Sequence, residues 1–189
     1  MNRMVPGTTI KFNEQARISA FSLIAPILEA TGGLTLSQLS KLTGLEGSTI
    51  QNWIKRGWVS STKGKKYSHR QILRILIINM LRDSMKLDDI AKLMTYVNGD
   101  VEDVSDDIIE EQALYDILCR IIFTAEDENT FEPEAVKKLI EAELEHSAGR
   151  VCSDEERLKK ALFVMIMAFR SAFLKRQMEA MLDEILKGN

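Results

Sequence analysis

The residues that could do chemistry gather in one stretch, from Gly47 to Gln71, which is rich in basic side chains and contains no Asp or Glu. Its amides, Gln51 and Asn52, can each form paired hydrogen bonds with the edge of an adenine in the major groove of DNA. Its cations can pair with phosphates, which dominate the affinity of proteins for nucleic acid. The chemistry offered here is therefore the binding of nucleic acid through base edges and backbone together.

Two groups of residues form this expected interface. Three polar side chains would read base edges: Ser48, Gln51 and Asn52. Cationic and polar side chains around them would contact phosphates: Lys55, Arg56, Lys63, Lys65, Lys66, Tyr67, His69 and Arg70. A basic surface that only keeps the protein in solution is the alternative interpretation, and the order of the surrounding elements favours binding.

Two short helices are expected to position the reading side chains. The first begins at Thr35, which can form a capping box with Gln38, so that each side chain satisfies a free backbone group at the helix start. The second lies within residues 46–57 and begins at Glu46 or at Ser48. Short helices joined by a tight turn that contains Gly are typical of a helix-turn-helix, whose second helix enters the major groove.

A wing is expected beside the second helix. Residues 58–67 are predicted to form a small two-stranded ribbon, which Trp58 enters and Tyr67 leaves, with its turn at Lys63 and Gly64. The lysines of this ribbon would lie against the DNA backbone.

Further helices complete the predicted fold. The spacing of apolar residues and helix-capping residues predicts them at about 13–28, 68–81, 86–98, 105–123, 133–146 and 153–185. Capping boxes begin two of them, Ser68 with Gln71 and Ser153 with Glu156. The last helix has a stripe with the spacing of a coiled coil: Leu158, Leu162, Met165, Phe169 and Ala172.

Charge is divided unevenly along the chain. Residues 35–98 hold 11 Lys or Arg and 4 Asp or Glu, a net charge of +7, whereas residues 99–147 hold 3 and 16, a net charge of −13. Blocks of opposite charge suggest separate roles. They support a second hypothesis, a protein-interaction module in which the acidic segment 99–147 covers a basic partner surface or folds over its own helix-turn-helix as an inhibitor.

Few residues suit catalysis or metal binding. The only histidines and cysteines are His69, His146, Cys119 and Cys152, and none belongs to a nucleophile, metal or phosphate-loop motif. We therefore expect no enzyme activity, no metal and no cofactor. Two separated cysteines are typical of a reduced, cytoplasmic protein, and no apolar run approaches the roughly 20 residues that cross a bilayer. We expect a cytoplasmic location and no membrane contact.

The order of these motifs resembles the winged helix-turn-helix of MerR-type transcriptional regulators. Four groups of residues carry the resemblance: Thr43-Gly44-Leu45 at the turn, Thr49-Ile50 at the start of the recognition helix, Arg56-Gly57-Trp58-Val59 at the wing entry, and Lys65 and Tyr67 at the wing end. Gln51 and Asn52 stand where the family has arginine and tyrosine. The phrases "NWIKRGWV" and "LRDSMKLDDIAKLMTYVNG" further resemble a group of uncharacterised bacterial proteins that carry this domain.

The resemblance implies a mainly α-helical fold in three parts. Residues 1–33 would form an N-terminal helix and linker, residues 34–99 the winged helix-turn-helix, and residues 100–189 a C-terminal helical region for dimerisation or effector binding. It also implies a transcriptional regulator that binds double-stranded DNA as a homodimer. An unknown small-molecule effector, bound between the C-terminal helices, stays open.

Overall fold

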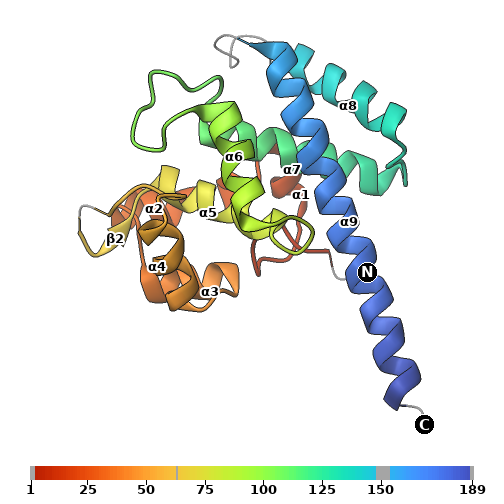
Figure 1. The fold of residues 1–189 in the computed structure, drawn as a ribbon, viewed down its shortest axis with the longest axis horizontal. Helices are drawn as coiled ribbons and strands as arrows, with labels where there is room; N and C mark the ends of the chain where they lie inside the picture. Colours follow the sequence, from red (N-terminus) through yellow and green to blue (C-terminus); the bar gives the residue numbers. More distant parts are fainter. Residues whose placement is uncertain (1–2, 63, 148–153, 188–189) are drawn as a thin grey trace.

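The fold is mainly α-helical, with one small antiparallel sheet (Figure 1). The computed structural model describes residues 3–62, 64–147 and 154–187. Within these residues the chain forms nine α-helices, one short 3-10 helix and two strands. The expected mainly helical fold with a two-stranded sheet is confirmed at this level.

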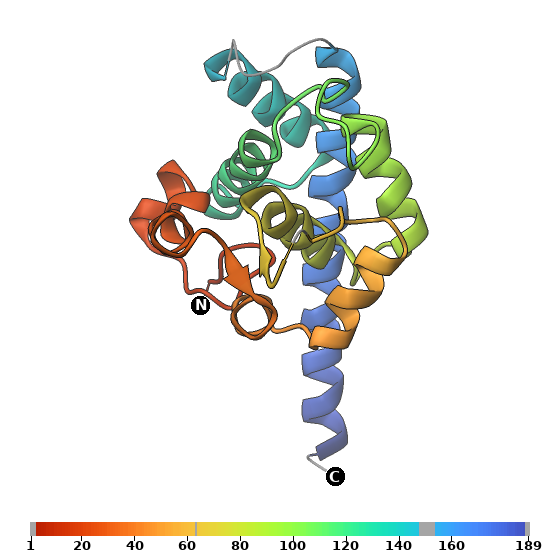
Figure 2. The same cartoon turned by 90° about the vertical axis from the view of Figure 1, so that its left-hand side faces the viewer.

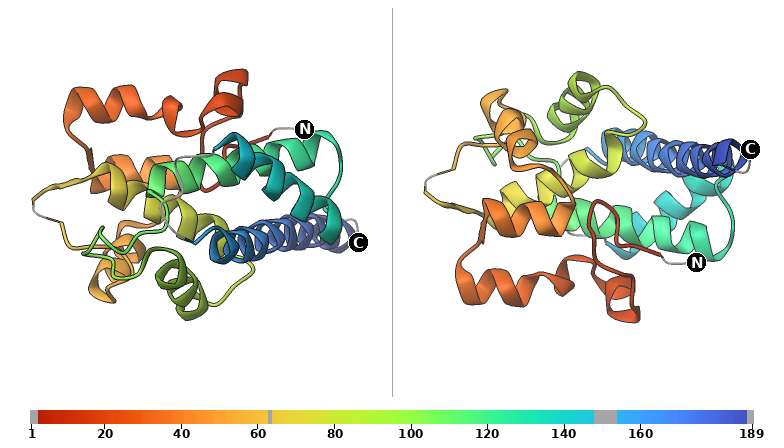
Figure 3. Two further views of the ribbon diagram at one scale, coloured as in Figure 1. Left: turned by 90° about the horizontal axis from the view of Figure 1, so that it is seen from above. Right: turned by 90° about the horizontal axis from the view of Figure 1, so that it is seen from below.

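Helix α5 (His69–Leu81) lies at the centre of the molecule. Every residue from Gln71 to Ile78 is buried, because other helices pack on most of its sides. Its neighbours are α3 (Leu36–Thr43), α6 (Leu87–Asn98), α7 (Glu111–Asp127) and α9 (Glu155–Lys187). Figure 3 shows α3, α4 (Gly47–Lys55) and β2 (Lys66–Tyr67) toward one end and α7, α8 and α9 toward the other.

The N-terminal region differs from the expected single helix over 13–28. It forms α1 (Glu14–Ile18), a 3-10 helix (Phe21–Leu23) and α2 (Ala25–Thr31). Asn13 caps α1, with its side-chain oxygen accepting from the backbone N–H of Ala16 at 3.0 Å. The chain then breaks because the carboxylate of Asp116 accepts from the Ser19 hydroxyl and from the backbone N–H of Phe21.

The two helices of the expected helix-turn-helix are present. Thr35 caps α3, and both hydrogen bonds of its capping box with Gln38 are formed. Helix α4 (Gly47–Lys55) begins after Glu46, so the earlier of the two predicted starts is the one observed. Gly44 has a φ of +71° at the end of α3, in the left-handed region that favours glycine.

The strands of the sheet are not those of the predicted ribbon. Strand β2 (Lys66–Tyr67) pairs with β1 (Leu34–Thr35), and Leu34 lies opposite Tyr67. The close approach depends on Gly33, where a Cβ atom would lie 2.4 Å from the carbonyl oxygen of Tyr67. The sheet therefore joins the residues before α3 to the residues before α5. The expected ribbon from Trp58 is wrong, and its predicted turn residue Lys63 lies outside the described residues.

The C-terminal helices follow the prediction, except that both boundaries of α7 are shifted toward the C-terminus. Helix α7 begins at Glu111, not near Ser105, because Ile108 and Ile109 are buried within a non-helical segment. Helix α8 (Pro133–His146) has the predicted bounds, and its proline lies in the first turn. Helix α9 continues to Lys187, and the predicted capping residue Ser153 lies outside the described residues.

The coiled-coil stripe predicted in α9 faces the interior of its own chain. Four of its residues are buried where α9 packs on α6, α7 and α8, and the fifth is partly buried: Leu158, Leu162, Met165, Ala172 and, partly, Phe169. This stripe therefore belongs to the intramolecular core and is covered in the single chain.

Candidate nucleic-acid interface

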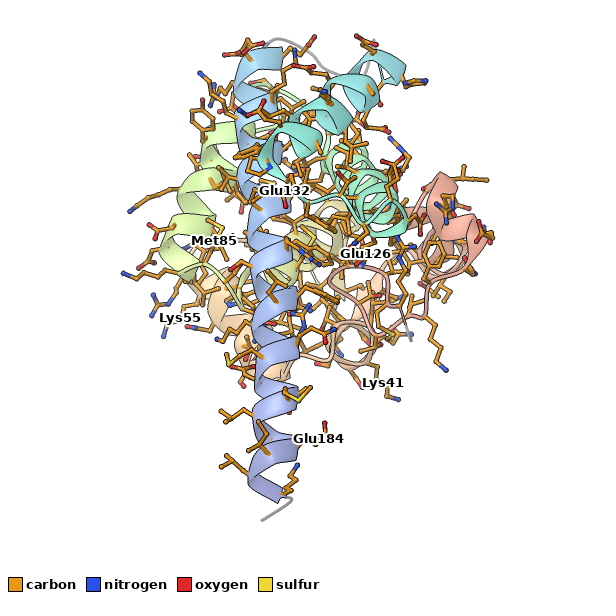
Figure 4. All side chains as sticks on the ribbon, turned by 90° about the vertical axis from the view of Figure 1, so that its right-hand side faces the viewer. Lys41, Lys55, Met85, Glu126, Glu132 and Glu184 are labelled. Atoms are coloured by element: carbon orange, nitrogen blue, oxygen red, sulfur yellow. The ribbon has the colours of Figure 1, made fainter. Side chains whose placement is uncertain are left out.

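Helix α4 separates its apolar side chains from its polar ones. Ile50 and Trp53 are buried, with 0% and 1% of their surface exposed, and they fix the helix on the core. The opposite side of the helix and its end are exposed and polar: Ser48, Gln51, Asn52, Lys55 and Arg56. The structure thus brings together all the residues predicted to read base edges, and Figure 4 shows Lys55 pointing away from the body of the molecule.

The loop after α4 is held by side chains of α5. Arg74 donates from Nε to the carbonyl oxygen of Trp58 at 2.8 Å, and Gln71 donates from Nε2 to that of Ser60 at 2.8 Å. The guanidinium of Arg56 stacks 5.2 Å from the centre of the Trp58 ring. These contacts fix the start of the loop 58–65, which we call the wing loop.

Two of the predicted phosphate-binding residues lie where the wing loop meets β2. Lys65 and Lys66 are exposed, and the ammonium of Lys66 donates to the backbone carbonyl of Thr31. His69 is also exposed, and its ring makes an edge contact with Phe21 at 5.7 Å between centroids. These side chains lie at the wing and at the first turn of α5.

Tyr67 does not join this exposed group. Only 6% of its surface is exposed, and burial raises the pKa of its phenol above the ordinary value. Its ring packs in the core behind β2, so the structure argues against the predicted phosphate contact through this side chain.

Arg70 is engaged by the acidic part of the chain. Its Nε donates to Glu111 at 2.9 Å, and its Nη2 donates to Asp107 at 3.1 Å. Since both carboxylates belong to the acidic segment 99–147, part of this segment lies against the basic region. The predicted phosphate contact of Arg70 therefore requires the loss of these ion pairs.

Sequence reasoning missed the second arginine of this network. Arg74 is 3% exposed and lies 3.4 Å from Glu111, while its Nε binds the wing loop. A signal was present, because Arg74 interrupts the apolar run of α5 and a buried cation needs a partner. The identity of that partner was hidden, since Glu111 is far away in the sequence.

Asp107 is the member of this network whose pKa is strongly shifted. Its pKa is raised from 3.8 to about 6 by burial and by the neighbouring carboxylate of Glu111, against the opposing effect of Arg70. Asp106 raises it further and Arg74 lowers it. The network therefore contains two carboxylates that share two guanidinium groups.

Other chemistry is sparse in the described part of the chain. It contains no group of three or more His, Cys, Asp or Glu placed to hold a metal ion. Cys119 is fully buried, and burial raises the pKa of its thiol well above the ordinary value. His146 contacts the carbonyl oxygen of Ala142, and Cys152 lies outside the described residues. Nor does any described helix combine the length and apolar character needed to cross a bilayer.

One cleft lies between the C-terminal helices. It has a volume of about 550 Å³ and lies between α7 and α8, beside the exposed Ile18. Its cation, Arg120, is already paired with Glu143 at 2.6 Å. The small-molecule effector stays a prediction, and this cleft is one of the described spaces that could receive one.

Part of this chain is similar to a known protein family. Residues 29–118 match the family model "Domain of unknown function (DUF1836)". The matched part contains α3, α4, the wing loop, α5 and α6, and it ends within α7.

One curated relative is similar over a longer stretch. "Uncharacterized protein YkrK" of Bacillus subtilis (strain 168) is 29% identical over 122 residues, which are 61% of this chain and 52% of that protein. The chain thus spans about half the length of this relative. No solved structure gives a significant match. Neither match names a DNA-binding family, so the resemblance to MerR-type regulators stays a prediction.

The raised pKa of Asp107 predicts a pH dependence of stability. The folded state holds this proton more tightly than the unfolded state, so this group should make the free energy of unfolding fall as the pH rises from about 4 to about 6. The Asp107→Asn variant lacks this titrating group, so its free energy of unfolding lacks this dependence on pH. Urea unfolding across this range should show the variant gaining stability relative to the natural chain as the pH rises.

The exposed Asp88→Asn is the matched control for removal of one carboxylate. A stability difference between Asp107→Asn and the natural chain that stays constant across this pH range would contradict the assignment.

Proposed function

We propose that the chain is a DNA-binding transcriptional regulator that reads the major groove through α4, as the second helix of a MerR-like winged helix-turn-helix. One observation carries the proposal: Gln51 and Asn52 lie exposed on a helix that Ile50 and Trp53 hold on the core. Amide side chains on a rigid, exposed helix are suited to pair with adenine edges.

The surroundings of α4 suit a nucleic-acid backbone. Helix α3 packs on α4, and the wing loop begins directly after α4. Exposed cations flank the reading side chains at Lys55, Arg56, Lys65 and Lys66. Phosphate contacts position a protein on the duplex, whereas base contacts supply the sequence preference. We assign the first task to these cations and the second to Ser48, Gln51 and Asn52.

The tail of α9 supports the proposed homodimer. From Leu174 to Lys187 every residue is exposed, and the tail extends beyond the body of the molecule (Figures 1, 2 and 4). Large apolar side chains occupy one side of it: Leu174, Met178, Met181, Leu182, Ile185 and Leu186. Four of them have alternating spacings of four and three, the pattern that packs one helix on another. A second copy of the tail would cover this stripe.

Removal of one cation from α4 tests DNA binding. Lys55→Ala should weaken binding of a mixed-sequence duplex and reduce the slope of log affinity against log salt by about 0.9, the loss of one phosphate contact. Fluorescence anisotropy with a labelled duplex, at several salt concentrations, measures both quantities.

Lys138→Ala is the matched control, because Lys138 is an exposed lysine of α8, away from α4. Absence of binding by the natural chain at low salt contradicts the proposal, as do equal effects of the two substitutions.

A charge placed on the α9 stripe tests the dimer. Met181→Glu should convert a dimer into a 21.4 kDa monomer, because it places a carboxylate in the proposed helix contact. Ala180→Glu adds the same charge on the opposite side of the helix and should leave the dimer intact. Light scattering coupled to size exclusion gives the mass. A monomeric natural chain, or an equal effect of both variants, would rule out this interface.

A further inference from the structure

We infer that residues 100–111, the first part of the acidic segment 99–147, compete with DNA for binding to the same chain. These residues place carboxylates at two positions suited to bind a phosphate, one in the wing loop and one at the start of α5. A duplex must displace the carboxylate at the wing loop before it can engage that loop. The inference rests on the proposed function and adds a means of regulating it.

The first position is in the wing loop itself. The backbone N–H of Ser61 donates to Oε1 of Glu102 at 2.9 Å, and the Ser61 hydroxyl lies 3.3 Å from the same oxygen. Backbone N–H groups and serine hydroxyls are common donors to DNA phosphates. The carboxylate of Glu102 therefore occupies the place that a phosphate oxygen would take at this residue.

The second position is at the first turn of α5. Arg70 presents a forked guanidinium there, the geometry that pairs with either carboxylate or phosphate. Asp107 and Glu111 already occupy it, and their side chains are 10% and 4% exposed. The acidic segment thus neutralises a cation that would otherwise attract the duplex.

The acidic segment is held in shape by its own hydrogen bonds. The carboxylate of Asp106 accepts from the backbone N–H of Asp100 at 3.1 Å, and Asp100 accepts from that of Glu102 at 2.8 Å. Asp106 packs so closely on Gly99, where φ is +45°, that a Cβ atom there would lie 1.8 Å from its Oδ2. In Figure 1 this loop extends on the same side of the molecule as β2, and Glu102 within it contacts Ser61.

The carboxylates at the two positions differ in how easily they can be displaced from their partners. Glu102 and Ser61 are exposed, where an interaction between charged or polar groups is weak and screened by salt. Asp107 and Glu111 are largely buried beside Arg70 and Arg74, and Ile108 and Ile109 fix the chain between them. The segment should therefore release the wing loop at Glu102 while it stays attached at 107–111.

Removal of the Glu102 carboxylate tests the inference. Glu102→Ala in the full chain should bind a labelled mixed-sequence duplex about threefold more tightly than the natural chain at low salt, since an exposed contact of this kind is weak. Glu141→Ala on α8 removes the same charge from an exposed site away from the wing and should change the affinity less. Hydrogen exchange at the Ser61 amide, measured without DNA, should become faster in Glu102→Ala only.

The outcomes separate the inference from the proposed function. Tighter binding by Glu102→Ala than by Glu141→Ala, with faster exchange at Ser61, supports both. If the natural chain binds DNA and the two variants bind it equally, internal competition is overturned while DNA binding stands. If neither the natural chain nor Glu102→Ala binds the duplex at low salt, both proposals fail.

Discussion

The buried guanidinium of Arg74 is the interaction on which the arrangement of this molecule depends. A buried cation without partners costs several kcal/mol, so its position is fixed by the groups that pair with it. Those groups come from two distant parts of the chain, the carbonyl oxygen of Trp58 and the carboxylate of Glu111. Through Arg74, α5 therefore holds together the loop after α4 and the acidic residue Glu111 at the start of α7.

The parts of the fold that the sequence predicted are those set by local interactions. The capping boxes of Thr35 and Ser68 join residues three apart, so their signal is complete within one turn of helix. The pairing of Leu34 with Tyr67 joins residues far apart in the sequence, and two-residue strands leave no alternating pattern to detect. The break of the first helix depends on Asp116, which lies even farther away in the sequence.

The candidate site also has one part that local sequence patterns predict and another that depends on distant residues. The exposed side of α4 follows from periodicity alone, because Ile50 and Trp53 select the buried side and leave Gln51 and Asn52 outside. The engagement of Arg70 does not follow from periodicity, since it requires a partner about 40 residues away. The charge blocks of the sequence indicated that a basic and an acidic part of the chain could pair, but they did not identify the pairs. Only the structure identifies Glu102 as the partner of Ser61, and Asp107 and Glu111 as the partners of Arg70.

The most direct test of the account is whether α4 reads sequence. Enrichment of bound duplexes from a random pool should give a defined motif for the natural chain. Gln51→Ala should lose the preference at one position of that motif, because a bidentate amide contact to a base is absent. Lys55→Ala should keep the motif at lower affinity, since a phosphate contact carries no sequence information. No enriched motif for the natural chain, or an unchanged motif for Gln51→Ala, would contradict major-groove reading through α4.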